Sequence, residues 1–89
     1  MKSNKEVPYG NIKLTQDIGD IVRASRKEQG ATQAEFAALC GVGTRFISDL
    51  ENGKATAELG KVLVVIQSLG LELHLQSRGW KNNRNGKTE

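Results

Sequence analysis

The 89-residue sequence has one cysteine, one histidine and no long hydrophobic run. Cys40 alone can form neither an internal disulfide bond nor a cysteine-rich zinc site, so we expect a reducing, cytoplasmic environment. The longest apolar run, residues 62–66, is far too short to span a bilayer, and the first ten residues lack the apolar core of a signal peptide. We therefore expect a protein with no membrane segment and no structural metal.

The sequence also lacks the residue combinations on which enzymes depend. It shows no paired nucleophile and base, no cluster of metal ligands and no phosphate-binding loop. The lone histidine, His74, falls at an outward position of an alternating segment, where a metal or catalytic role is not expected. The chain is therefore predicted to be no enzyme and to need no cofactor.

The positive charge of the chain is unevenly distributed. The formal net charge is +3, yet residues 1–77 contain nine Lys and Arg against nine Asp and Glu, while residues 78–89 contain four basic residues against one acidic. The body is thus neutral, and net charge does not supply a surface for nucleic acid. Any such surface must come from the arrangement of a few cations, which are Arg23, Arg26, Lys27, Arg45 and Lys54.

Glycines mark the ends of segments with helical periodicity. Gly30, Gly41, Gly53 and Gly70 each follow such a segment, at the position where a left-handed residue commonly ends a helix. Four helices are therefore predicted, in a single small domain. A core of this size is only marginally stable without a partner subunit, so oligomerisation is expected.

The predicted helices begin at recognisable capping residues. The first begins at about Thr15 as N-cap, the second at Thr32, whose hydroxyl can cap it, and the third near Gly43 or Thr44. The fourth spans residues 56–69, and a glycine inside it predicts a close backbone approach there. The inward face of the first helix is predicted to comprise Leu14, Ile18, Ile21, Val22 and Ser25. The inward face of the fourth is predicted to comprise Leu59, Val62, Leu63 and Ile66, and the glycine inside this helix is Gly60.

The most informative segment spans Gln33 to Leu50 and has the spacing of a helix-turn-helix. Ala37 is small where two helices nearly touch, and Gly41 lies four residues later, where the turn requires a positive φ. Apolar residues recur at positions that point inward from two short helices meeting at a wide angle. These residues are Phe36, Cys40, Val42, Ile47 and Leu50.

After Gly70 the periodicity changes from helical to alternating. Leu71, Leu73 and Leu75 alternate with polar residues, which predicts a half-buried strand over residues 71–77. No other segment alternates well, so the simplest mate is the same strand of a second copy, in a two-fold homodimer.

The two ends of the chain are polar. Residues 1–12 are predicted to be an N-terminal arm, residues 13–70 the helix-turn-helix domain, and residues 78–89 a flexible basic tail. Trp80 in that tail either covers the dimer ribbon or contacts a partner, and its sequence context does not distinguish the two.

The segment TQAEFAALCGVGTRFISDLENGK resembles the helix-turn-helix of the Xre, or phage-repressor-like, family. The resemblance covers roughly residues 17–69 and implies an all-α, lambda-repressor-like domain of four to five helices. The continuation SLGLELHLQSRG is similar to the HipB-like antitoxins, in which one added C-terminal strand pairs across a homodimer. That subfamily represses its own operon and neutralises a HipA-type serine/threonine kinase toxin.

The resemblance also implies roles for individual residues. It implies base contacts for Thr44, Arg45, Ser48 and Asp49, with Arg45 the best candidate for a bidentate contact to guanine. Asp49 either accepts a hydrogen bond from a base or excludes wrong sequences by its charge. The residues implied to contact the DNA backbone are Gln33, Gly43, Asn52, Lys54 and Arg23, and Arg26 and Glu51 are implied to form a structural salt bridge.

Three functions are compatible with these features of the sequence. The first is a repressor that binds a palindromic double-stranded DNA operator as a dimer and acts as the antitoxin of a HipA-like kinase. The second is a stand-alone Xre-family regulator without a toxin partner. The third is a protein-binding adaptor that kept only the fold. It ranks last because the outward polar residues are all present, namely Gln33, Thr44, Arg45, Ser48, Asn52 and Lys54.

Overall fold

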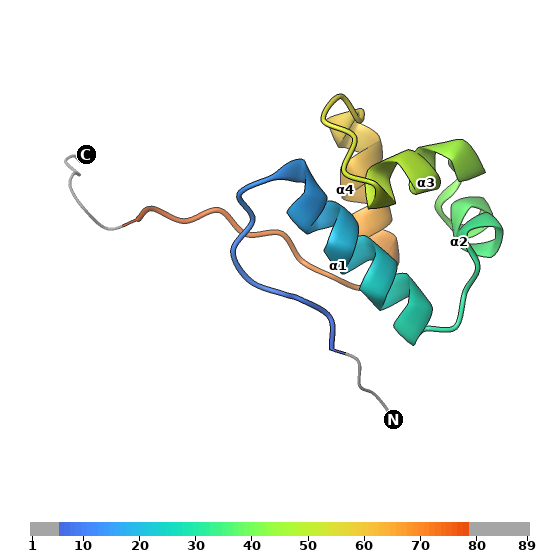
Figure 1. Ribbon diagram of the computed structural model, residues 1–89, viewed down its shortest axis with the longest axis horizontal. Coiled ribbons are helices and arrows are strands. Elements are labelled where there is room, and N and C mark those ends of the chain that lie inside the picture. The colour runs from blue at the N-terminus through green and yellow to red at the C-terminus, as the bar shows by residue number, and fades with distance from the viewer. Residues whose placement is uncertain (1–5, 79–89) are drawn as a thin grey trace.

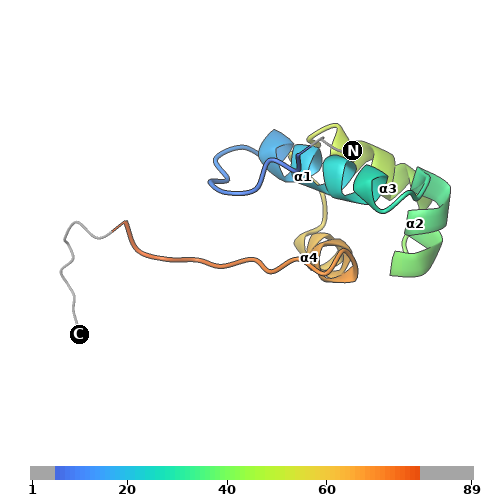
Figure 2. The ribbon, with the colours of Figure 1, turned by 90° about the horizontal axis from the view of Figure 1, so that it is seen from below.

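The computed structural model describes residues 6–78, and this part of the chain forms four helices joined by short loops (Figure 1). The helices are α1 (Thr15–Glu28), α2 (Gln33–Cys40), α3 (Thr44–Glu51) and α4 (Leu59–Ser68). α3 contacts both α1 and α2, and α4 contacts α2. Figure 2 shows α1 and α3 on one side of the molecule and α4 beneath them. The predicted all-α class is confirmed, with four helices in the described residues.

The start of α2 and the turn after it follow local sequence signals. The Thr32 hydroxyl accepts a hydrogen bond from the Glu35 N–H at 3.1 Å, and the Glu35 carboxylate accepts one from the Thr32 N–H at 2.9 Å. These reciprocal bonds satisfy two N–H groups that a helix start leaves unpaired. Gly41 ends α2 with φ 75°, and α3 begins at Thr44 after the N-cap Gly43. The predicted caps of α2 and α3 are therefore confirmed.

The start of α1 differs from its prediction by one residue. Leu14 is the N-cap, and the Asp17 carboxylate accepts hydrogen bonds from the Lys13 and Leu14 N–H groups at 2.8 and 2.9 Å. The Thr15 hydroxyl is not the cap; it donates to the Gly53 carbonyl oxygen at 2.7 Å. The prediction that Leu14 is inward was wrong, because the cap position directs its side chain to solvent.

One hydrophobic core lies between the four helices. The inward positions predicted for the helix-turn-helix are confirmed: Phe36, Ala37, Ile47 and Leu50 are buried, and Cys40 and Val42 pack against them. Burial of each large side chain contributes about 1.5–3 kcal/mol to the free energy of unfolding. The rest of the buried cluster consists of Val22, Val62, Val65, Ile66 and Leu69.

α4 begins three residues later than predicted, and this changes its buried face. Val65 is completely buried, whereas Leu59, predicted to be inward, is 65 % exposed. Gly60 was expected to mark a close approach, but a β-carbon there would meet no atom within 4 Å. Both predictions were wrong because residues 56–58 are not helical. Leu59 and Gly60 therefore lie in the first turn of α4, which is exposed. The close approach lies instead at Gly19 of α1, which faces α3.

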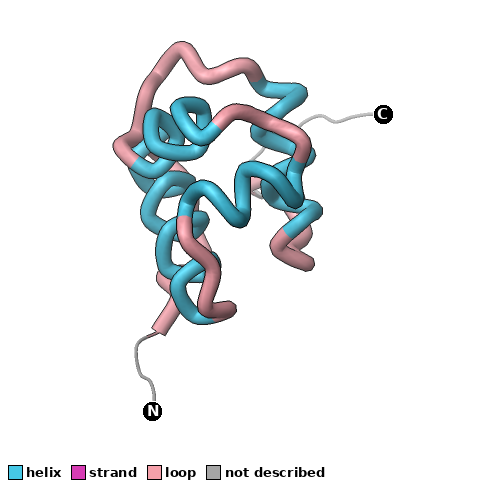
Figure 3. The backbone as a smooth tube through the Cα atoms, turned by 90° about the vertical axis from the view of Figure 1, so that its right-hand side faces the viewer, coloured by secondary structure: helices cyan, strands magenta, loops and turns pink. Residues whose placement is uncertain are grey.

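Residues 71–78 run away from the helices as an extended segment (Figures 1 and 2). Leu71 packs against the core, while Leu73 and Leu75 are 46 % and 94 % exposed. The predicted strand is absent from the described residues, which contain only helices and loops (Figure 3). A strand requires a neighbouring strand, and residues 6–78 of the single chain contain no second strand. Trp80, the tail over 79–89 and the first five residues of the arm lie outside the described residues.

No helix within residues 6–78 has both the length and the apolar character that are required to cross a bilayer.

Candidate nucleic-acid interface

The outward side of α3 carries the four residues predicted to contact bases. Thr44 and Arg45 at the start of the helix are exposed, and Ser48 and Asp49, one turn further on, are half-buried. The opposite side of α3 is buried through Ile47 and Leu50 of the core. A helix anchored in this way by its apolar side presents its N-terminal polar side chains together, which is the geometry that major-groove recognition uses.

Asp49 lies between two cations on this surface. Its Oδ1 is 3.6 Å from Nε of Arg45, and its Oδ2 is 3.5 Å from Nζ of Lys54. The Arg45 side chain is 90 % exposed, so this ion pair is weak and readily exchanged for a contact to DNA. The Lys54 N–H also donates to the Asp49 carbonyl oxygen at 3.0 Å, which fixes the chain just after α3. The negative charge of Asp49 is thereby offset on both sides.

Phe46 does not belong to the polar surface, although it neighbours Arg45 in sequence. Its side chain is half-buried and packs against the core. The Lys61 Nζ of α4 lies 5.8 Å from the centre of its ring, a distance at which a cation is attracted to an aromatic face. Lys61 thus brings a cation from α4 to the side of α3. Sequence reasoning missed it, because no spacing within the chain indicates which helix faces Phe46.

The residues predicted to contact the DNA backbone lie in three places: beside α3, at the start of α2 and on α1. Gly43 and Asn52 are the exposed residues that flank α3, and Lys54 follows directly. Gln33 is the first residue of α2. Arg23 is exposed on α1 and forms no ion pair with any described residue. Gly43, Asn52 and Lys54 thus adjoin α3 in the chain, whereas Arg23 belongs to a different helix.

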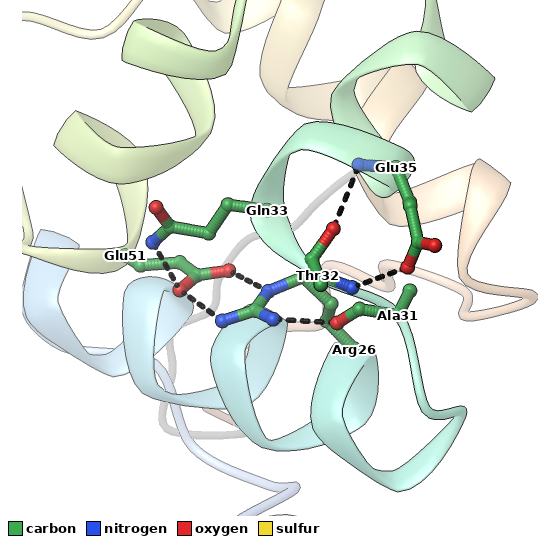
Figure 4. A network of polar contacts seen from close by, with 6 residues as sticks. All are labelled: Arg26, Ala31, Thr32, Gln33, Glu35 and Glu51. Atoms are coloured by element: carbon green, nitrogen blue, oxygen red, sulfur yellow. Dashed lines mark hydrogen bonds and ion pairs between the residues drawn. The ribbon is translucent and has the colours of Figure 1, made fainter.

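A buried ion pair connects α1 to the end of α3 (Figure 4). Arg26 Nε donates to Glu51 Oε2 at 2.6 Å and Arg26 Nη2 donates to Glu51 Oε1 at 2.9 Å. The Arg26 Nη1 donates to the Ala31 carbonyl oxygen at 2.6 Å. The hydrogen-bonded Glu51 carboxylate raises the pKa of Arg26 above its ordinary value. The salt bridge implied by the sequence resemblance is present, and it fixes the angle between α1 and α3.

Two further contacts from α1 hold the end of α3 and the turn that follows it, and sequence reasoning found neither. Gln16 Nε2 donates to the Glu51 carbonyl oxygen at 3.1 Å, and the Thr15 hydroxyl donates to the Gly53 carbonyl oxygen. The Gln16 bond satisfies a carbonyl group that the end of α3 leaves unpaired, and the Thr15 bond binds the residue that follows the C-cap Asn52. Side chains of α1 thus hold both the end of α3 and the turn after it.

Residues 22–75, more than half of the chain, match the helix-turn-helix family. This chain belongs to the Xre-type helix-turn-helix family. It is a DNA-binding, HTH-type transcriptional regulator, and the family is not one of enzymes, in agreement with the prediction from the sequence.

Individual relatives agree with this membership. The chain is 53 % identical over 68 residues to the uncharacterized HTH-type transcriptional regulator y4mF of Sinorhizobium fredii, across 76 % of this chain and 90 % of that regulator.

Solved structures of this helix-turn-helix type are similar as well. A HipA-HipB-O2-O3 complex and a HipB-O4 20mer complex each contain a chain that matches with a TM-score of 0.71 and 26 % identity. Each match covers 79 % of this chain and 99 % of the other. The resemblance to HipB-like proteins that the sequence indicated is therefore confirmed at the level of structure.

Proposed function

We propose that this Xre-type regulator is a sequence-specific repressor that binds a palindromic double-stranded operator as a homodimer. The observation that carries the proposal is the exposed polar side of α3, where Thr44, Arg45, Ser48 and Asp49 lie together above a buried apolar side. Two such helices in a dimer enter successive major grooves, one or more helical turns apart.

Arg45 is the main base-reading residue in this proposal. Its side chain is 90 % exposed at the start of α3, and a guanidinium matches the O6 and N7 acceptors of guanine in the major groove. Thr44 and Ser48 add short hydroxyls on the same side of the helix. Asp49 either accepts a hydrogen bond from a cytosine amino group or, by its negative charge, disfavours binding to sequences that offer no hydrogen-bond donor there.

The contacts to the DNA backbone surround this reading surface. Lys54 supplies a cation just beyond α3, and Gly43 and Asn52 flank the helix at its two ends. Gln33 begins α2, where the N–H groups and the dipole of a helix start favour a phosphate. Arg23 adds a longer-range attraction from α1.

The homodimer is proposed to form through residues 71–77. Leu73 and Leu75 are exposed on an extended segment whose sequence alternates apolar and polar residues, and such a segment can pair with the same segment of a second copy. The strand predicted over residues 71–77 would form only in this dimer, because strand pairing requires the second chain.

We further propose that the protein is the antitoxin of a HipA-type serine/threonine kinase toxin and represses the operon that encodes both. The likeness to the HipB chain of a HipA-HipB-O2-O3 complex, over 79 % of this chain, supports this role. A regulator of this kind acts in the cytoplasm, where the single thiol of Cys40 stays reduced.

A stand-alone regulator is the second candidate function. It is supported by the relative that is 53 % identical, which is named as an uncharacterized HTH-type transcriptional regulator. The adaptor alternative has less support, because the polar side of α3 is complete.

The deciding experiment has two parts. The full chain is used to select duplexes from a randomised DNA library, and a two-fold symmetric consensus supports the repressor. The purified chain is then mixed with the product of the adjacent gene. A stable complex with a kinase-like product supports the antitoxin role, and failure to bind favours the stand-alone regulator.

A further inference from the structure

The carboxylate of Glu51 binds more than its ion-pair partner. Its Oε1 accepts hydrogen bonds from two donors, Arg26 Nη2 at 2.9 Å and Gln33 Nε2 at 3.0 Å (Figure 4). Arg26 comes from α1, Gln33 from the first turn of α2, and Glu51 from the end of α3. One buried carboxylate, with 2 % of its side chain exposed, therefore joins all three helices.

The contact to Glu51 determines which end of the Gln33 amide is turned inward. A glutamine amide can rotate so that either its carbonyl oxygen or its NH₂ group points in a given direction, because the last torsion is broad. An ionised carboxylate only accepts hydrogen bonds, so Glu51 selects the orientation with the NH₂ group toward it. That nitrogen carries two hydrogens, and only one is used by Glu51 among the described residues.

We propose that Glu51 is a positioning residue for the DNA backbone contact of Gln33, on which proposed contact this inference rests. Glu51 holds the Gln33 nitrogen so that its second N–H donates to a phosphate oxygen. Without Glu51 the amide also adopts the opposite orientation, in which a carbonyl oxygen repels the phosphate.

The ion pair with Arg26 serves this purpose because it makes the acceptor rigid. Arg26 binds both carboxylate oxygens, so the carboxylate cannot turn away from Gln33. A buried ion pair adds little net stability compared with a well-packed apolar pair. Two apolar residues could thus tie α1 to α3, but they could not orient an amide. The network also links the phosphate contact on α2 to the position of α3.

The first test uses the unmodified, full-length protein. The ¹⁵N heteronuclear NOE of each side-chain amide reports its mobility by NMR. We expect the Gln33 amide to be as rigid as the backbone of α2, and the amide of Gln67, exposed on α4, to be mobile. Equal mobility of Gln33 and Gln67 in the free protein would overturn the inference.

The second test is a double-mutant cycle on DNA affinity. The probe is the tightest duplex that the full chain selects from a randomised library. Gln33→Ala is measured alone and in an Arg26→Met/Glu51→Leu background, with folding checked by circular dichroism. We expect Gln33→Ala to raise Kd about tenfold alone, because it removes a hydrogen bond to a charged group. In the background without the carboxylate we expect a further change of less than about twofold.

The outcomes of this cycle are distinguishable. An equal loss from Gln33→Ala in both backgrounds means that Gln33 contacts DNA without help from Glu51, which refutes the positioning role alone. No loss in either background refutes the backbone contact itself. If the Arg26→Met/Glu51→Leu protein fails to fold, the NMR measurement decides. Gln29→Ala is the matched control, because Gln29 Nε2 donates to the Leu69 carbonyl oxygen; it should leave Kd unchanged.

Discussion

Gly19 of α1 lies against the carbonyl oxygen of Leu50 in α3 so closely that a β-carbon at residue 19 would overlap with it. The Glu51 carbonyl oxygen would lie 2.9 Å from the same β-carbon. Both neighbours are backbone atoms, which cannot rotate away as the end of a side chain can. The absence of a side chain at Gly19 therefore sets the distance between α1 and the helix that carries the base-reading residues.

We predict that Gly19→Ala lowers the free energy of unfolding by about 1–3 kcal/mol, because the two helices must move apart. Gly60→Ala is the matched control, since a β-carbon at that helical position meets nothing within 4 Å. It should raise the free energy of unfolding by about 0.5–1 kcal/mol through the smaller entropy of the unfolded chain. Urea denaturation measures both, and a neutral Gly19→Ala would contradict the close approach.

Arg45→Ala should weaken binding to the selected operator by about 1–3 kcal/mol and relax the base preference at one position. The reason is the loss of a bidentate contact from the one cation of α3. Fluorescence anisotropy with operators substituted one base pair at a time measures this effect. An equal loss on every duplex would show that Arg45 contacts only phosphate.

Lys54→Ala should behave differently from Arg45→Ala. A contact to the DNA backbone carries no sequence information, so affinity should fall by a similar factor on all duplexes. The slope of log Kd against the logarithm of the salt concentration should decrease by about one. Titrations at several salt concentrations check this. A selective loss on one operator sequence would assign Lys54 to base recognition instead.

The cap of α1 should make stability depend on pH in the acid range. The hydrogen bond from the Lys13 N–H, and to a smaller extent the one from the Leu14 N–H, lowers the pKa of Asp17 below its ordinary value of 3.8. A lowered pKa in the folded state means that the stabilisation is fully present above that ordinary value and is lost as pH falls through the lowered one. The difference in Tm between the wild type and Asp17→Ala should therefore be constant near neutral pH and shrink in acid. A difference that persists at strongly acidic pH would contradict the cap.

Deletion of residues 71–89 should weaken dimerisation and operator binding together, because two half-sites bind tightly only when the subunits are joined. Sedimentation measures the first effect and DNA titration the second. Leu73→Asp is a smaller change that should act in the same direction, and His74→Asp, on the alternate face of the predicted strand, is its control. An unchanged dimer after the deletion would refute the proposed strand pairing.

Local chemistry explains what the sequence determined by itself. The Thr32 cap, the left-handed Gly41 and the inward residues Phe36, Ile47 and Leu50 depend on neighbours within about one helical turn or on helical periodicity. Those signals lie within short stretches of the sequence, so the two helices of the helix-turn-helix were predicted correctly.

Tertiary structure decided the contacts between residues far apart in sequence. The burial of Val65 rather than Leu59 followed from where α4 begins, and the approach at Gly19 depends on the path of α3. The bond from Gln33 to Glu51 likewise joins residues 18 positions apart. No local pattern specifies such pairs, because they exist only once the packing of the shared core has fixed the angles and distances between helices.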